Sequence, residues 1–133
     1  MTTQEPNVRL IERYLKIAAE GGDGEAQMAL GLWIARMDER GERMRGIAGV
    51  AHYKKAIRWL SQAADHGMAA AWFAISRIYL KPEFSRRSIT ESRRFLEIAA
   101  NAGCLRAQVE LGLVAWRARR LEPRADVRAV YWL

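Results

Sequence analysis

The two histidines and the single cysteine of this chain, His52, His66 and Cys104, are residue types that often bind metals or react covalently. The histidines lie 14 residues apart, and neither has a cysteine or carboxylate at the spacing of a metal site. His66 is expected at a helix C-terminus, where a histidine is typically a favourable cation. The single cysteine can form no disulfide within the chain and follows a helix-ending glycine, which favours a buried structural thiol. The sequence therefore predicts no metal site.

Sequence motifs of catalytic sites are also missing. The stretch from Gly41 to Gly49 lacks the Lys-Ser/Thr pair and the preceding strand of a phosphate-binding loop. No Ser-x-x-Lys or Gly-x-Ser-x-Gly sequence occurs, and the carboxylates are scattered singly on faces that are expected to be solvated. We therefore expect a protein that is not an enzyme, that uses no cofactor, and that acts by binding.

The net charge is +7, and most of it lies in the C-terminal half. Residues 67–133 contain twelve basic and six acidic residues, whereas residues 1–66 contain ten and nine. Eighteen of the 22 basic residues are arginines, which pair with carboxylates and phosphates through two parallel hydrogen bonds. A coding bias toward arginine would give the same count, so the composition leaves the class of partner open.

A short pattern that recurs three times predicts the architecture. Residues 18–22, 63–67 and 99–103 all have the form Ala-Ala-x-x-Gly, and an aromatic residue followed by leucine begins four residues before each. A unit of about 36 residues is typical of a solenoid, in which stacked helical hairpins bury apolar faces that no hairpin buries alone. The first spacing is 45 residues, because it contains an insertion within residues 36–51.

Apolar residues at helical spacing predict two helices in each unit. The first helix of each unit is expected over residues 24–39, 68–81 and 104–120, and loops are expected at 40–51, 82–87 and 121–125. The second helix ends at the repeated glycine, which supplies a left-handed backbone conformation.

We therefore predict one all-α domain over residues 1–133. Its parts are a cap helix at 6–21, a first repeat at about 24–66, a second at about 68–102 and a third at about 104–133. Residues 128–133 match residues 55–60, so the third repeat ends early in its second helix. Either the chain is cut from a longer protein, or residues 131–133 cover an apolar end that would otherwise be bare. A bare end would favour self-association.

The repeated residues are similar to those of a known repeat family. Residues 55–71 have the form Lys-Ala-x-x-Trp-x-x-x-Ala-Ala-x-x-Gly-x-x-x-Ala, which resembles the Sel1-like repeat, a relative of the tetratricopeptide repeat. The sequence Ala-x-x-x-Leu-Gly at 107–112 is similar to the same family. His52 stands where the family usually has aspartate, Ser76 replaces glycine, and Glu-Ser at 91–92 replaces Lys-Ala. The resemblance implies a right-handed superhelix of about three antiparallel helix pairs, whose first helices line a concave groove, and an adaptor that holds other proteins.

The related tetratricopeptide fold implies which side chains face that groove. They are apolar residues interleaved with bases: Met28, Leu32, Ala35, Arg36, Phe73, Arg77, Leu80, Lys81, Arg106, Val109, Leu113, Trp116 and Arg117. The predicted partner-binding residues among them are Arg36, Phe73, Arg77, Lys81, Arg106, Trp116 and Arg117. A peptide with apolar anchors and acidic flanks would suit such a groove. Alternatively, Leu32, Phe73 and Leu113 pack between repeats, and the bases are solvated helix ends.

Two classes of partner remain open at this point. The first is a protein or peptide, acidic where it meets the bases. The second is nucleic acid or an anionic membrane surface, bound through the arginines at 86–87, 93–94 and 117–128. Glu91 and Glu97 dilute that basic patch, which disfavours the second class. No signal peptide, membrane-spanning stretch or cysteine pair is present in the sequence, so a cytoplasmic protein is expected.

Overall fold

A computed structural model of the chain describes residues 5–36, 46–82, 84 and 87–121. These residues form six helices and no strand. The helices are α1 (Glu5–Glu20), α2 (Gly24–Arg36), α3 (Gly46–Asp65), α4 (Ala69–Ile78), α5 (Arg87–Asn101) and α6 (Leu105–Leu121). The all-helical prediction is therefore confirmed for the described part of the chain.

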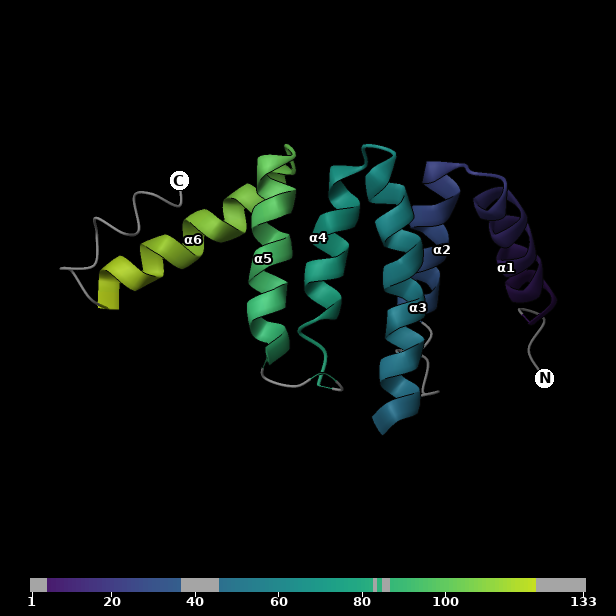
Figure 1. The fold of residues 1–133 in the computed structure, drawn as a ribbon, viewed down its shortest axis with the longest axis horizontal. Helices are drawn as coiled ribbons and strands as arrows, with labels where there is room; N and C mark the ends of the chain where they lie inside the picture. The colour runs from purple at the N-terminus through teal and green to yellow at the C-terminus, as the bar shows by residue number, and fades with distance from the viewer. Residues whose placement is uncertain (1–4, 37–45, 83, 85–86, 122–133) are drawn as a thin grey trace.

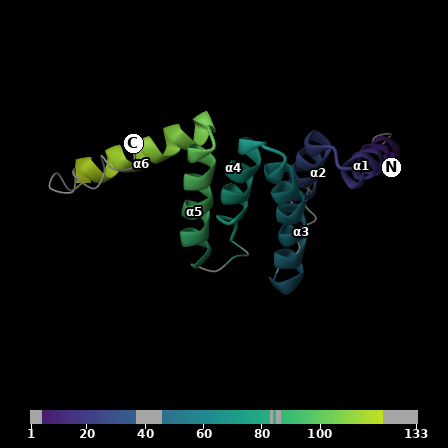
Figure 2. The ribbon, with the colours of Figure 1, turned by 45° about the horizontal axis from the view of Figure 1, so that its top comes forward.

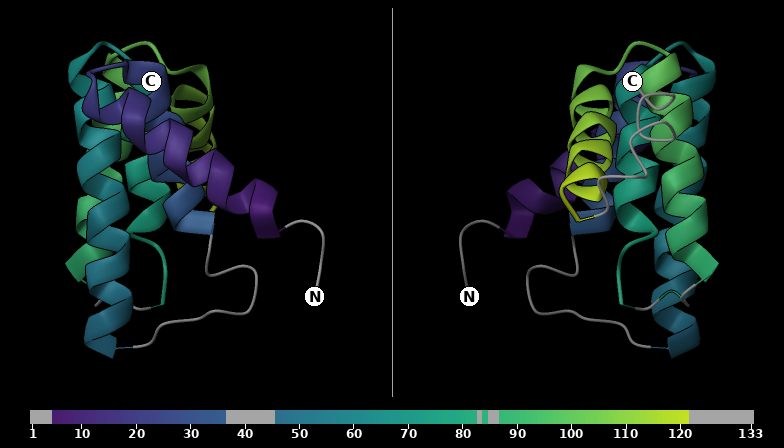
Figure 3. Two further views of the ribbon diagram at one scale, coloured as in Figure 1. Left: turned by 90° about the vertical axis from the view of Figure 1, so that its right-hand side faces the viewer. Right: turned by 90° about the vertical axis from the view of Figure 1, so that its left-hand side faces the viewer.

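The helices lie in a row in the order of the sequence (Figure 1). Each helix packs mainly against the helices that precede and follow it. Helices α3 and α5 form one layer and α2, α4 and α6 the other, as the views along the row show (Figure 3). The end helices α1 and α6 lean away from the central four, which stand side by side (Figure 2).

The three repeated glycines form the same turn at the end of α1, α3 and α5. Gly22, Gly67 and Gly103 have φ angles of 97°, 90° and 100°, in the left-handed region. The N–H of each glycine donates to the carbonyl of the second repeated alanine at 2.9–3.1 Å. The N–H of the next residue donates to the carbonyl of the first alanine at 3.0–3.3 Å. The Ala-Ala-x-x-Gly pattern is thus a helix-capping motif, and the predicted role of the glycine is confirmed.

Replacing Gly67 by alanine is expected to lower the free energy of unfolding by about 1–2 kcal/mol, because a residue with a Cβ is strained in the left-handed region. Crowding contributes nothing to this loss, since an added Cβ at Gly67 would meet no atom within 4 Å. Urea unfolding followed by circular dichroism measures the change. Gly67→Asn should lower the free energy of unfolding by less than Gly67→Ala, because asparagine tolerates the left-handed conformation better than alanine. Equal losses for the two variants would contradict a backbone origin.

Helix α3 begins at Gly46, so residues 46–51 are helical and the loop prediction for them is wrong. Gly49, Tyr53 and Ala56 lie one turn apart and are all buried. Their packing outweighs the roughly 1 kcal/mol by which each glycine disfavours a helix interior. The predictions for residues 40–45, for the loop beyond 121 and for the match at 128–133 lie outside the described residues.

Helix α4 ends at Ile78, three residues before the predicted end at Lys81. Pro82 has no N–H to donate to Ile78, and its ring would clash with that carbonyl in a continued helix. Instead, the N–H groups of Leu80 and Lys81 donate to carbonyls three residues earlier, at 3.2 and 3.0 Å. The bounds of α1 and α6 agree with the expected ones within one residue, and the predicted helix end at residue 39 lies outside the described residues.

The main core lies between α2, α3 and α4, and its tightest contact is at Gly31. A Cβ added to Gly31 would lie 2.7 Å from Cγ of Leu60 and 3.1 Å from the carbonyl oxygen of Ala56. Gly31 therefore lets α2 and α3 approach closely, because any larger residue would meet Leu60. At the equivalent place in α4, Ser76 is buried; its hydroxyl donates to the Phe73 carbonyl at 2.6 Å, and its own carbonyl accepts from Ser92 of α5 at 2.7 Å.

Aromatic rings fill the space between α4 and α5. Phe95 stacks on both Trp72 and Tyr79, with ring centroids 5.8 and 5.5 Å apart. Burial raises the pKa of the Tyr79 phenol above its ordinary value, and the nearby Glu91 carboxylate adds to this rise. His52 places Nε2 2.7 Å from the Ile34 carbonyl oxygen and so links α3 to α2. Within the described residues no helix has the length and hydropathy required to cross a membrane.

Candidate binding groove

A pocket of about 360 Å³ opens between α2 and α4, beside the start of α6. Its lining residues are Met28, Leu32, Ala35, Arg36, Ala70, Phe73, Ala74, Arg77, Ile78, Lys81, Cys104 and Arg106. Most of them are residues that the sequence predicts to face a groove. Five of the seven predicted partner-binding residues meet here, namely Arg36, Phe73, Arg77, Lys81 and Arg106.

Two stripes of side chains form the opposite walls of the pocket, and both run from apolar to basic residues. On α2 the stripe runs from Met28 through Leu32 to Arg36, at four-residue spacing. On the α4 side it runs from Phe73 through Arg77 to Lys81. Side chains four residues apart lie on the same face of a helix, so Met28, Leu32 and Arg36 share one face of α2. Phe73 and Arg77 share one face of α4, and Lys81 follows that helix. Each stripe therefore starts apolar and ends basic. Both helices run from the upper to the lower edge of the row, so Arg36 and Lys81 lie toward the same end (Figure 1).

Phe73 belongs both to the pocket and to the core. Its side chain is only 9% exposed and packs in a second buried cluster with Ala99 and Ala107. The guanidinium carbon of Arg77 lies 5.9 Å from the centre of the Phe73 ring, and that of Arg106 lies 5.2 Å from it. Such cation–π contacts favour the position of both guanidinium groups beside the pocket.

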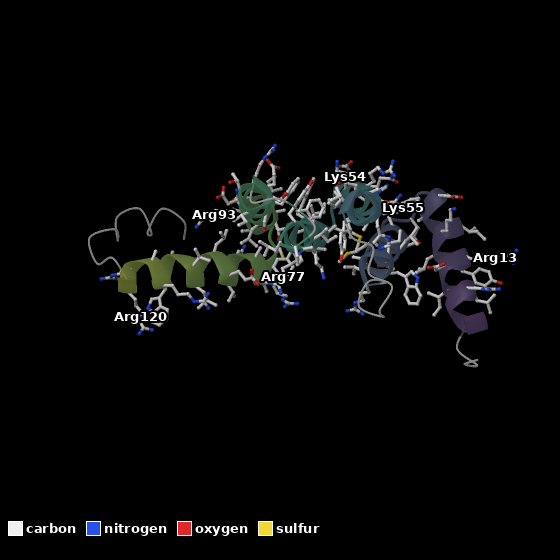
Figure 4. The ribbon with its side chains drawn as sticks, turned by 90° about the horizontal axis from the view of Figure 1, so that it is seen from below. Arg13, Lys54, Lys55, Arg77, Arg93 and Arg120 are labelled. Carbon is white, nitrogen blue, oxygen red and sulfur yellow. The ribbon has the colours of Figure 1, made fainter. Side chains whose placement is uncertain are left out.

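The pocket is basic at its rim. Four of its lining residues carry a positive charge, and none of those that the structure describes is acidic. Arg77 projects from the layer of α2, α4 and α6, away from α3 and α5 (Figure 4). Its Nη1 lies 3.1 Å from Oε1 of Glu110 on α6, and the two side chains are 56% and 36% exposed. Lys81 places Nζ 5.9 Å from the centre of the Tyr53 ring.

The remaining predicted residues do not line the pocket. Trp116 and Arg117 lie farther along α6, which leans away from α4 (Figure 1). Trp116 is 56% exposed, and its ring contacts the guanidinium group of Arg120 at 5.2 Å. The other predicted groove residues outside the pocket are Leu80, Val109 and Leu113, all exposed.

Some lining residues were not predicted. Ala70, Ala74 and Ile78 form a third stripe at four-residue spacing, next to the stripe that begins at Phe73. This spacing is visible in the sequence, but small residues carry no chemical signal of a site. Cys104 is half-buried at the edge of the pocket, so the expectation of a buried thiol is wrong.

The other candidate groups are separated from this pocket. His66 places Nδ1 2.9 Å from the Gln62 carbonyl at the end of α3, and His52 contacts Ile34 as described above. Among the described residues no three histidine, cysteine or acidic side chains are grouped so as to hold a metal ion. Arg93 on α5 and Arg120 on α6 project from different layers and in different directions (Figure 4). Arg93 and Arg120 therefore do not belong to one basic patch.

Comparisons with known protein families, with curated protein sequences and with solved structures found no match for this chain. The function is therefore inferred from the pocket and from the chemistry of its lining residues. An apolar floor suits the side chain of a ligand, and exposed guanidinium groups around it suit carboxylates.

Proposed function

We propose that this chain is a non-catalytic scaffold that binds a peptide segment of a protein partner in the pocket between α2 and α4. In this proposal the helix pairs form a right-handed superhelix of the Sel1-like type, and the pocket is part of its concave face. The observation that supports binding most directly is the combination of apolar lining residues with four bases and no described acidic one.

The size and lining of the pocket fit one part of a peptide. Ligand pockets commonly measure roughly 300–1,000 Å³, so about 360 Å³ is enough for one large apolar side chain and its neighbours. The anchor side chain would contact Leu32 and Phe73. Carboxylates that flank the anchor would meet Arg106 on one side and Arg36 on the other. Apolar anchors and arginines are the groups that often dominate the binding energy of such interfaces.

Ala70→Glu tests the pocket as the binding site. Ala70 is exposed in the first turn of α4, where a carboxylate is favourable for the helix, so this variant should fold. Its side chain would enter the pocket and compete for the bases. Peptides selected from a phage-displayed library of random 12-residue sequences should bind it at least about tenfold more weakly than the parent chain. Fluorescence polarisation of labelled synthetic peptides measures the affinities.

Ala51→Glu is the matched control, because Ala51 is exposed on α3, outside the lining of the pocket. This variant should bind the selected peptides as the parent chain does. If Ala70→Glu binds them equally well, or if the selection yields no peptide that responds to Ala70→Glu, the pocket is not the binding site of a peptide.

The second candidate is an anionic surface, either nucleic acid or membrane. The observation that favours it is the exposure of Arg117, Arg119 and Arg120 near the end of α6. Phosphate binding depends steeply on salt, with a log–log slope of about −0.9 for each contact on duplex DNA. Binding through an apolar anchor depends on salt much less. Charge reversal inside and outside the pocket therefore separates the two candidates.

A further inference from the structure

Glu110 places a carboxylate of the chain itself next to the pocket, although it is not one of the lining residues. It lies on α6, one turn after Arg106, and forms the 3.1 Å ion pair with Arg77 of α4. The two residues are 33 positions apart in the sequence, so the pair joins two helices that are not neighbours in the row. In the free protein, a base that would serve an acidic ligand is thus already paired with an internal acid.

We propose that Glu110 is an internal competitor, which a carboxylate of the bound segment replaces on Arg77. This inference rests on the proposed function, because it takes an acidic peptide segment as the ligand of the pocket. Both members of the ion pair are solvent-accessible, at 56% and 36% exposure. Separating them therefore leaves no buried, unpaired charge, since water solvates the released carboxylate.

The pair can open without displacing the guanidinium group from the pocket. Arg77 keeps its contact with the Phe73 ring, and Arg106 contacts the same ring. A carboxylate that enters beside this ring therefore finds two guanidinium groups in place. Because those groups are already positioned, their side chains lose less freedom on binding.

The replacement of Glu110 by a ligand carboxylate determines which peptide segments the pocket binds well. A ligand with a single carboxylate replaces one ion pair by another and gains little. A ligand with carboxylates on both sides of its apolar anchor also engages Arg36, which lies at the other end of its stripe. We infer that Glu110 discriminates against weakly acidic segments and that the partner segment is acidic on both sides of the anchor.

Glu110→Gln tests the exchange, because it removes the competing charge and keeps the size of the side chain. It should tighten the binding of an acidic selected 12-residue peptide about two- to fivefold, the range that exposed ion pairs typically contribute. The same peptide with its glutamates and aspartates replaced by their amides should show no gain. Glu97→Gln on α5 changes the net charge equally and should leave both affinities unchanged. In an Arg77→Gln background the gain from Glu110→Gln should disappear.

Three results would overturn the inference: no gain for the acidic peptide, an equal gain for the amide peptide, or a gain that persists in the Arg77→Gln background. If the selected peptides respond to Ala70→Glu and any of these results is found, the pocket still binds peptides but Glu110 does not compete. If the selected peptides respond to Ala70→Glu but contain no acidic residue, the pocket also binds peptides without competition from Glu110. If no peptide responds to Ala70→Glu, both the proposed function and the exchange are refuted.

Discussion

Leu60→Ala is expected to lower the free energy of unfolding by about 3 kcal/mol, and Gly31→Ala should be much less destabilising in this background than in the parent chain. Leu60 is fully buried between α3 and α2. In the parent chain, Gly31→Ala alone should be destabilising by about 1–3 kcal/mol, because its Cβ would lie 2.7 Å from Cγ and 3.0 Å from Cδ2 of Leu60. Removing those carbons relieves the two shortest contacts of the new methyl group, and the Ala56 carbonyl oxygen at 3.1 Å remains. Urea unfolding of the four proteins measures the coupling.

Gly22→Ala provides the control for this cycle. An added Cβ at Gly22 would meet no atom within 4 Å, so its effect arises only from its φ angle of 97°. The loss of unfolding free energy caused by Gly22→Ala should therefore add to the loss caused by Leu60→Ala, within about 0.5 kcal/mol. If the losses of Gly31→Ala and Leu60→Ala were additive to the same degree, the contact between α2 and α3 would not be as close as described.

Reversing the charges of Arg36 and Arg106 together is expected to weaken binding of an acidic selected peptide by about thirtyfold, roughly 2 kcal/mol. The two residues belong to different helices, and both are exposed, so Arg36→Glu and Arg106→Glu should not prevent folding. The loss has two sources: each reversal removes an attraction to a carboxylate and adds a repulsion. Fluorescence polarisation at constant ionic strength measures the affinity, because screening by salt would otherwise change it.

The matched control reverses Arg58 on α3 and Arg119 on α6, which are exposed and do not line the pocket. It changes the net charge by the same amount and should weaken the binding much less. An equal loss in the two double variants would indicate attraction to the overall positive charge, as an anionic surface would show. If neither double variant lost affinity, acidic side chains would not take part in recognition.

The turns at the repeated glycines were predictable because their sequence signals are local. The turns at Gly22, Gly67 and Gly103 need only the glycine and the two alanines before it, all within five residues. The start of α3 was not predictable in this way. The glycines at 46 and 49 favour a loop locally, but burial of Tyr53 and Ala56 against other helices extends the helix back to Gly46. Long-range packing thus outweighed the local preference.

The candidate site was predictable where it depends on positions within one helix. The stripes that end at Arg36 and Lys81 follow from four-residue spacing, and so the sequence indicated them. The position of Trp116 was not predictable, because it depends on the angle between α6 and α4. That angle is set by the contact of α6 with α5, which buries Ala107 and Leu111. The pairing of Glu110 with Arg77 depends on the same angle and has no sequence signal.

The position of each base along its helix makes the two ends of the pocket differ in their electrostatics. Arg36 is the last residue of α2, where the partial negative charge of the helix dipole offsets its own charge. Arg106 lies in the first turn of α6, where the partial positive charge adds to its own. The helix dipoles therefore lower the potential at Arg36 and raise it at Arg106. An asymmetric acidic segment should consequently enter in one orientation, with its more acidic end toward α6.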